Sequence, residues 1–247
     1  MATPHIILCG FGVTDSLQLT VETQRALARY GAAYTLGAGP NLLAFLKSQR
    51  VAVTELDARI ATGRPYADTY LEIAHFLVER TAHQRPVILI APGHPLMFNA
   101  IGRYVAAEGK RLELAVQVLP GVSPLDAIIG GIGLDVATFG LQVFDCTRLV
   151  QRRLPINPAV PAILMNAGVA GFSAPESVQV PDLRPLVKYL SACYPETHPA
   201  AVVNLTPNGL AVASTSLARL PAASDQLQPG SHLFLDAVRQ PTPATPA

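Results

Sequence analysis

The chain has 247 residues, of which 50% are hydrophobic and 14% are charged. This length is ample for a sizeable core in one large domain or two compact ones. The formal net charge is +1, and adjacent basic residues occur only as short pairs such as Arg152-Arg153, so the composition excludes the electrostatic footprint of a nucleic-acid-binding protein.

Three isolated cysteines, Cys9, Cys146 and Cys193, form neither a disulfide framework nor a CxxC metal site. This pattern favours a reducing compartment. The first ten residues lack the basic region of a signal peptide, and no apolar run approaches the length of a membrane-spanning helix. We therefore expect a cytoplasmic protein with no membrane partner.

Apolar runs alternate with segments of helical periodicity in the first half of the chain. The predicted elements, in chain order, are a strand at 6–9, a helix at 17–30, a strand at 33–36, helices at 41–49 and 66–81, a strand at 87–91, a helix at 98–108 and a strand at 114–119. Asp15, Ser16 and Thr20 are candidate caps of the first helix. Strands that alternate with helices predict a mainly parallel sheet.

The second half is richer in strands. Ser123 as N-cap, Pro124 at the first helical position and Asp126 at the third predict a helix start. Strands at 140–146, 162–166, 200–205 and 232–238 and one helix at 182–193 follow. We expect an α/β domain at 1–119, a second α/β domain with a mixed sheet at 120–240, and a disordered tail at 241–247.

Three strand ends share a loop chemistry, namely Gly10-Phe11-Gly12, Pro92-Gly93-His94-Pro95 and Pro120-Gly121-Val122-Ser123. Ligands of open α/β sheets bind at the carboxyl ends of strands, where glycine permits close approach and proline stiffens the loop. These loops therefore predict a rigid ligand wall. The sequence lacks the third glycine of a dinucleotide fingerprint, a Walker motif and a second metal-ligating histidine near His94, so we predict no metal site.

The order of these motifs resembles the tetrapyrrole (corrin/porphyrin) methylase family of S-adenosylmethionine-dependent methyltransferases. The resemblance rests on the initial GxG, "APGHPLMF", "LPGVSPLDA", "ILMNAG" and "VVNLTP", and covers about residues 6–235. The histidine in "PGHP" and the upstream Asp68-Thr69-Tyr70 are closest to the borosin branch, whose members methylate peptide backbone amides. The resemblance implies the two-domain class III fold, S-adenosylmethionine as cofactor and a homodimer.

Carried over position by position, the resemblance implies a set of cofactor-binding residues. They are Gly10, Gly12, Gly93, His94, Met97, Phe98, Ser123, Pro124, Asn166, Val203, Asn204 and Thr206. Some have simpler interpretations that stay open: His94 as a helix cap, Ser123 as a cap alone, and Asn166 as a turn residue.

The acceptor side of the resemblance departs from the borosin pattern. Tyr70 matches an active-site tyrosine, but Tyr66 stands where an arginine is expected, and Arg64 lies two residues earlier. Pro92 replaces another tyrosine. We take Tyr70, Tyr66 and Arg64 as candidate catalytic residues. The alternative is that both tyrosines are core residues and that Arg64 is simply exposed.

The resemblance implies a methyltransferase that N-methylates backbone amides of a separate peptide. We expect the peptide in trans because the proline-rich C-terminal stretch offers few secondary amides. Two alternatives are a corrin or porphyrin ring methyltransferase and a non-catalytic homologue that binds the cofactor or a peptide. A small-molecule acceptor therefore stays open.

Overall fold

A computed structural model describes residues 3–15, 18–60, 63–174, 180–206 and 208–238. The chain divides into two compact units: unit 1 is Met1–Ala127 with Ser173–Ser177, and unit 2 is Ile128–Phe172 with Val178–Ala247. The predicted domain limits, 1–119 and 120–240, stay a prediction. The tail predicted at 241–247 and the candidate cap Ser16 lie outside the described residues.

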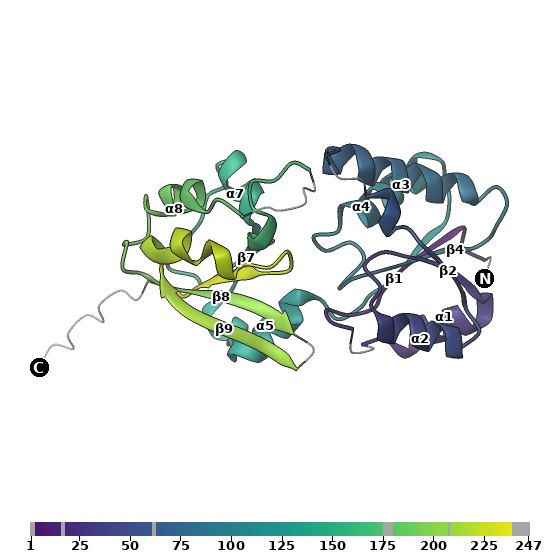
Figure 1. Cartoon of the computed structure of the whole chain (residues 1–247), viewed down its shortest axis with the longest axis horizontal. Coiled ribbons are helices and arrows are strands. Elements are labelled where there is room, and N and C mark those ends of the chain that lie inside the picture. Colours follow the sequence, from purple (N-terminus) through teal and green to yellow (C-terminus); the bar gives the residue numbers. More distant parts are fainter. Residues whose placement is uncertain (1–2, 16–17, 61–62, 175–179, 207, 239–247) are drawn as a thin grey trace, which may run out of the picture. The chain divides into compact units, whose positions relative to one another are not determined.

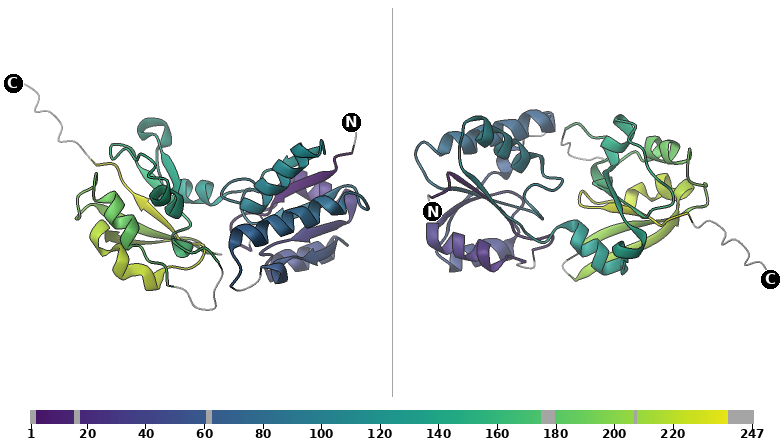
Figure 2. Two further views of the ribbon diagram at one scale, coloured as in Figure 1. Left: turned by 90° about the horizontal axis from the view of Figure 1, so that it is seen from above. Right: turned by 180° about the vertical axis from the view of Figure 1, so that it is seen from behind.

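Unit 1 is a parallel sheet with helices on both faces (Figures 1 and 2). Its elements are β1 (Ile6–Gly10), α1 (Val21–Tyr30), β2 (Ala32–Thr35), α2 (Pro40–Ser48), β3 (Ala52–Glu55), the 3-10 turn η1 (Asp57–Arg59), α3 (Tyr66–Arg80), β4 (Val87–Ala91), α4 (Ala100–Arg111), β5 (Val116–Leu119) and the start of α5 (Pro124–Ile132). The strand order is β3-β2-β4-β1-β5. β1 therefore lies between the central strand β4 and the edge strand β5, and all three run in the same direction.

The alternation of side chains along β1 and β4 divides the core of unit 1 between the two faces of the sheet. Ile6, Leu8 and Leu89 pack against α3 and α4, whereas Ile7 and Ile88 pack against α1 and α2. All five residues are buried. Continuous burial explains why both strands read as unbroken apolar runs, because a sheet covered on both faces has no solvent side.

Helix ends in unit 1 differ from the sequence prediction in two places. Thr20 caps α1, as one of the predicted candidates, but the Asp15 carboxylate accepts hydrogen bonds from the backbone N of Asn41 (2.7 Å) and Leu42 (2.8 Å) at the start of α2. Asp15 thus ties the loop after β1 to the second helix. This link joins segments 26 residues apart, which local capping rules do not reveal.

The helix expected from Phe98 begins at Ala100 instead. Asn99 is the N-cap, and its side chain accepts a hydrogen bond from the backbone N of Gly102 at 2.9 Å. Phe98 has φ = 51°, a left-handed conformation that cannot belong to a right-handed helix. The chain between β4 and α4 is therefore longer than the apolar run suggested.

Unit 2 contains a mixed sheet of strand order β6-β7-β10-β8-β9. Its elements are the end of α5, α6 (Val136–Phe139), β6 (Gln142–Asp145), α7 (Cys146–Gln151), β7 (Ala162–Met165), η2 (Ala167–Val169), α8 (Arg184–Leu190), β8 (Pro199–Thr206), β9 (Gly209–Ser216), η3 (Leu217–Gln226) and β10 (His232–Leu235). β6 and β7 are parallel, and β10 is antiparallel to both β7 and β8. One face of the sheet packs against α7, α8 and η3 around Leu149, Leu190 and Leu220.

Two edge strands and two short helices were not predicted. β3 and β9 are largely exposed, so neither shows the apolar alternation by which a half-buried strand is recognised. α6 and α7 have four and six residues, too few for a helical periodicity. The α/β fold class, with a parallel first sheet and a mixed second sheet, is confirmed.

Candidate active site

The loops after β1, β4 and β5 lie together at the carboxyl edge of the unit 1 sheet. Gly10 is paired with Ala91 and Cys9 with Leu119, so the three strands end at one level. Beyond that level, the backbone N of Gly93 donates to the carbonyl O of Gly12 at 2.7 Å. The first two loops are therefore bonded to each other directly.

Close backbone contact explains the glycines in these loops. A Cβ on Gly10 would lie 2.7 Å from the backbone N of Gly121 and still closer to the carbonyl O of Gly93. Gly93 has φ = +64°, and a Cβ there would lie 3.0 Å from Cδ of Pro124. Only residues without side chains allow the three loops to meet. Gly121, which is not among the predicted cofactor-binding residues, is part of the same contact.

His94 shapes the second loop through local hydrogen bonds. Its ring Nδ1 accepts from the backbone N of Leu96 at 3.1 Å, and its carbonyl O accepts from the backbone N of Met97 at 3.2 Å. Because Nδ1 is an acceptor, the neutral ring carries its proton on Nε2. His94 therefore closes the turn and does not cap α4.

Phe98 follows in the same loop and is unusual in two respects. It combines its left-handed backbone with a side chain that is 39% exposed. Bulky residues adopt this conformation only where their surroundings impose it, and such strain is concentrated at functional sites. Phe98 and the half-buried Met97 thus provide apolar surface in the same loop as Gly93. We call the contact of Gly10, Gly93 and Gly121 the glycine wall.

Ser123 and Asp126 form a reciprocal cap at the third loop. The Ser123 hydroxyl donates to Oδ2 of Asp126 at 2.6 Å, and the same carboxylate accepts from the backbone N of Ser123 at 2.7 Å. The backbone N of Asp126 donates back to the hydroxyl at 3.2 Å. Since the hydroxyl is used in capping α5, any contact from Ser123 to a ligand falls to its backbone.

The two candidate tyrosines lie together on α3, and Tyr70 packs against the core of unit 1. Their ring centroids are 5.4 Å apart. Burial raises the pKa of Tyr66 above its ordinary value, and burial, with a smaller contribution from Tyr66, raises the pKa of Tyr70 to about 12. Tyr70 is therefore protonated at neutral pH and can donate a hydrogen bond, but it cannot serve as a base in its resting state.

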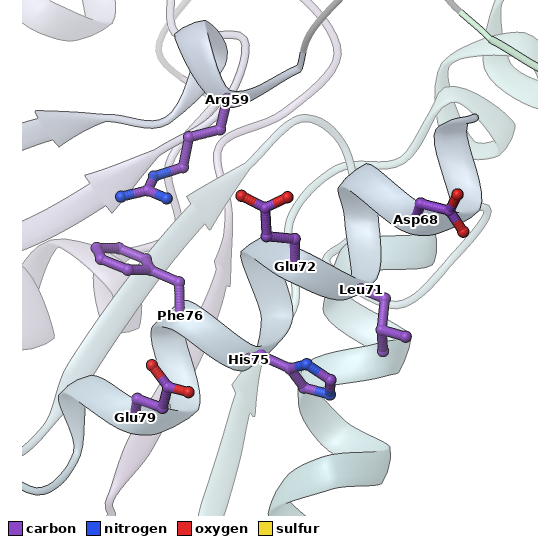
Figure 3. Close-up of a pocket in the computed structure, with 7 residues that line it drawn as sticks. All are labelled: Arg59, Asp68, Leu71, Glu72, His75, Phe76 and Glu79. Carbon is purple, nitrogen blue, oxygen red and sulfur yellow. The ribbon is translucent and has the colours of Figure 1, made fainter. Parts of the chain in front are cut away.

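Arg64 does not join the tyrosines. Its Nη1 lies 2.8 Å from Oε2 of Glu72, which belongs to another side of α3. That side carries an open pocket (Figure 3), lined by Arg59, Asp68, Leu71, Glu72, His75, Phe76 and Glu79. The Arg59 guanidinium stacks 3.9 Å from the Phe76 ring centroid. None of the predicted site residues lines this pocket.

In unit 2, polar side chains gather where β6, β7 and β8 end and β10 begins. Nδ2 of Asn166 donates to Oδ2 of Asp145 at 2.9 Å, and its backbone N donates to Nδ1 of His232 at 3.2 Å. The Ser231 hydroxyl donates to Oδ1 of Asn204. We call these five residues the strand-end cluster.

The other two predicted positions on β8 contribute less to this cluster. Val203 is fully buried, and the Thr206 hydroxyl donates to the carbonyl O of Gly209 at 3.0 Å within the β8–β9 hairpin. Asp145, Ser231 and His232 were missed. Each stands at or near one end of a predicted strand, and this position in the sequence was the feature that could have indicated a site residue.

Two of the three thiols, Cys9 and Cys146, are buried. Burial raises the pKa of Cys9 to about 12 and that of Cys146 further, so both remain unreactive thiols. Within the described ranges, no three or more histidine, cysteine or acidic side chains gather as a metal site, and no helix is long and apolar enough to cross a membrane.

The sequence profile of the Tetrapyrrole (Corrin/Porphyrin) Methylases matches residues 5–220. The chain belongs to this family. The Thermus thermophilus uroporphyrin-III-C-methyltransferase structure is similar with a TM-score of 0.65 and 19% identity, over 94% of this chain and 92% of that one. A diphthine synthase structure gives 0.64 and 17% identity, over 94% and 89%. At these identities the likeness shows the fold.

Curated relatives within the family carry borosin descriptions. The chain is 24% identical over 170 residues to the type I borosin cyclic peptide precursor and methyltransferase sveMA of Serendipita vermifera subsp. bescii, which covers 68% of this chain and 42% of that protein. The type II counterpart pgiMA1 of Phlebiopsis gigantea is 23% identical over 172 residues, or 69% and 31%. The chain thus spans less than half the length of these relatives.

The glycine contact predicts a selective loss of stability. Gly10→Ala should lower the free energy of unfolding by about 2–4 kcal/mol, because the new methyl group must displace backbone rather than a flexible side chain. Gly130→Ala is the matched control. Nothing lies within 4 Å of a Cβ at this helical position, so a gain of about 0.5–1 kcal/mol is expected. Urea denaturation of both variants measures the difference, and equal stabilities would contradict the proposed contact.

Proposed function

We propose that this chain is an S-adenosylmethionine-dependent methyltransferase whose acceptor is a backbone amide nitrogen of a separate peptide. The observation that carries the proposal is the glycine wall at the carboxyl edge of the unit 1 sheet, in a member of a methylase family. The borosin descriptions of the curated relatives support a peptide acceptor. The alternatives are a ring methyltransferase and a non-catalytic binding protein.

The residues present fit this cofactor. The contact among Gly10, Gly93 and Gly121 fills the space that their side chains would take, and it holds the main chain of the three loops at the sheet edge where ligands of open α/β sheets bind. Met97 and Phe98 add an apolar surface that excludes water. Within unit 2 taken by itself, the strand-end cluster carries polar groups that could bond a ligand. His94 and Pro124 hold the loops in shape, and we assign Gly12, Ser123, Val203 and Thr206 the same supporting role.

The bound cofactor supplies an electrophilic methyl group on a sulfonium, and methyl transfer from it needs no metal. The chain's own contribution is orientation, which can reduce a barrier by about 7–11 kcal/mol when both reactants are held in line. The amide nitrogen would lose its proton to solvent and take the methyl group as the bond from that carbon to the sulfonium sulfur breaks, which leaves a neutral thioether. While the proton leaves, the amide oxygen would carry more negative charge. A protonated Tyr70 aimed at that oxygen would stabilise the charge.

Tyr66 contributes to this role by its position. Its ring packs against Tyr70 and adds to the rise in the pKa of that hydroxyl. Arg64 would reach an acceptor only by leaving its ion pair with Glu72. That pair is exposed at both ends, so such an exchange costs little. We retain Arg64 as a residue that contacts the acceptor.

We further propose a cytoplasmic homodimer. All three cysteines are free, which supports a reducing compartment. Phe139 on α6 and Val212 on β9 are 59% and 47% exposed, and such apolar side chains support a buried surface between copies. Light scattering at micromolar concentration should give about twice the 26.1 kDa chain mass. A monomer that persists at higher concentration would contradict the homodimer.

Cofactor identity is tested by thermal shift. S-adenosylhomocysteine at a hundredfold excess over its Kd should raise the free energy of unfolding by about 2.7 kcal/mol. For a chain of this size, this corresponds to a rise in Tm of about 5–10 °C. NAD and ATP at the same concentrations are the controls and should leave Tm unchanged. Stabilisation by NAD without any effect of S-adenosylhomocysteine would refute the methyltransferase proposal.

The role of Tyr70 is tested by removing its hydroxyl. Tyr70→Phe should lower the rate of methyl transfer about a hundredfold, because one donor to the developing oxyanion is lost, while the Kd of S-adenosylhomocysteine stays nearly constant. Tyr30→Phe at the end of α1 is the control. Mass spectrometry of a peptide that the wild type methylates gives the rate, and calorimetry gives the Kd. A Tyr70→Phe variant with a lower Tm and an unchanged rate would make Tyr70 a core residue.

A further inference from the structure

Asn166 has an unusual backbone conformation at the end of β7. Its φ is 62° and its ψ is 36°, the left-handed region that asparagine tolerates better than other residues with side chains. The backbone N donates to Nδ1 of His232, the first residue of the neighbouring strand β10. The position of the Asn166 backbone is therefore fixed by an adjacent strand.

His232 acts here as an acceptor with a defined protonation state. The ring is buried, and desolvation lowers its pKa to about 4. At neutral pH the ring is uncharged, and the hydrogen bond from Asn166 requires the lone pair on Nδ1 and the proton on Nε2. The hydrogen bond from the backbone N of Asn166 to His232 therefore does not change with pH near neutrality.

The Asp145 carboxylate determines which way the Asn166 amide points. Oδ1 of Asp145 accepts from the backbone N of Arg148 at 2.9 Å, as the N-cap of α7, and Oδ2 accepts from Nδ2 of Asn166. An ionised carboxylate only accepts hydrogen bonds, so the NH2 of the amide must face it. Oδ1 of Asn166 has no partner among the described residues and points away from Asp145.

We propose that Asp145 is a positioning residue, which turns the Asn166 amide so that Oδ1 accepts a hydrogen bond from an N–H or O–H group of the bound cofactor. The proposal rests on the proposed function, since S-adenosylmethionine is the ligand assumed. It assigns a ligand-related role to a side chain that capping of α7 would otherwise explain fully.

Asp145→Asn separates the two roles. Asparagine keeps one oxygen for the cap of α7, where it is as favourable as aspartate, and places its NH2 against Asn166. The Asn166 amide must then rotate to pair its oxygen with this NH2, and it presents Nδ2 to the ligand. A hydrogen-bond acceptor becomes a donor at the same place, with little change in the fold.

The experiment is calorimetric titration of the full chain with S-adenosylhomocysteine. Asp145→Asn should weaken binding about tenfold or more, with the Tm of the unliganded protein within about 2 °C of wild type. The double variant Asp145→Asn with Asn166→Asp restores an acceptor, because the introduced carboxylate pairs with the new NH2 through one oxygen and presents the other. Its Kd should return to within about threefold of wild type.

Two further variants complete the test. Asp135→Asn is the matched control, because Asp135 caps α6 by accepting from the backbone N of Thr138 at 3.0 Å and makes no hydrogen bond to Asn166 among the described residues. The Kd of this variant for S-adenosylhomocysteine should equal that of the wild type. Asn166→Gly keeps the left-handed backbone and removes the amide, so its binding should also fall about tenfold, whether or not Asp145→Asn folds well.

Three results would overturn the proposal. They are a wild-type Kd in Asp145→Asn, a double variant that binds as weakly as Asp145→Asn, and unchanged binding by Asn166→Gly. In each of these cases S-adenosylhomocysteine still binds the wild type, so the methyltransferase proposal survives. Failure of the wild type itself to bind S-adenosylhomocysteine would remove the proposed function, and this inference with it.

Discussion

Gly10, Gly93 and Gly121 can meet only because none of them has a side chain. β1 lies between β4 and β5, so the three loops that follow these strands must share a small space at one edge of the sheet. Gly93 N bonds to Gly12 O, and this contact keeps the loops together. This one packing constraint sets the positions of His94, Phe98 and the cap of α5.

The two units supply different kinds of surface. In unit 1 the site is formed by backbone and apolar side chains, with Tyr70 as a protonated hydroxyl on α3. In unit 2 the strand-end cluster consists of side-chain hydrogen bonds, in which Asp145 and His232 fix Asn166 from two neighbouring strands. Backbone packing therefore shapes the strand ends of unit 1, and side-chain hydrogen bonds shape those of unit 2.

Sequence patterns predicted the buried strands well, since β1 and β4 are apolar on both faces. They failed at exposed elements: β9 carries small residues that face solvent, and its pairing with β8 leaves no periodic signal. At the candidate site, the resemblance located the loops, but contacts between distant segments were invisible. The Asp15 cap of α2, the Arg64–Glu72 pair and the Asp145–Asn166 bond each join residues whose proximity arises only on folding.

Methyl transfer to a peptide backbone nitrogen can be detected by tandem mass spectrometry of the reaction products. The purified chain is incubated with methyl-deuterated S-adenosylmethionine, a pool of synthetic peptides and, separately, uroporphyrinogen III. We expect a labelled methyl group on backbone nitrogens of one or more peptides and none on the tetrapyrrole. Label on a ring carbon of the tetrapyrrole, with none on any peptide, would contradict it.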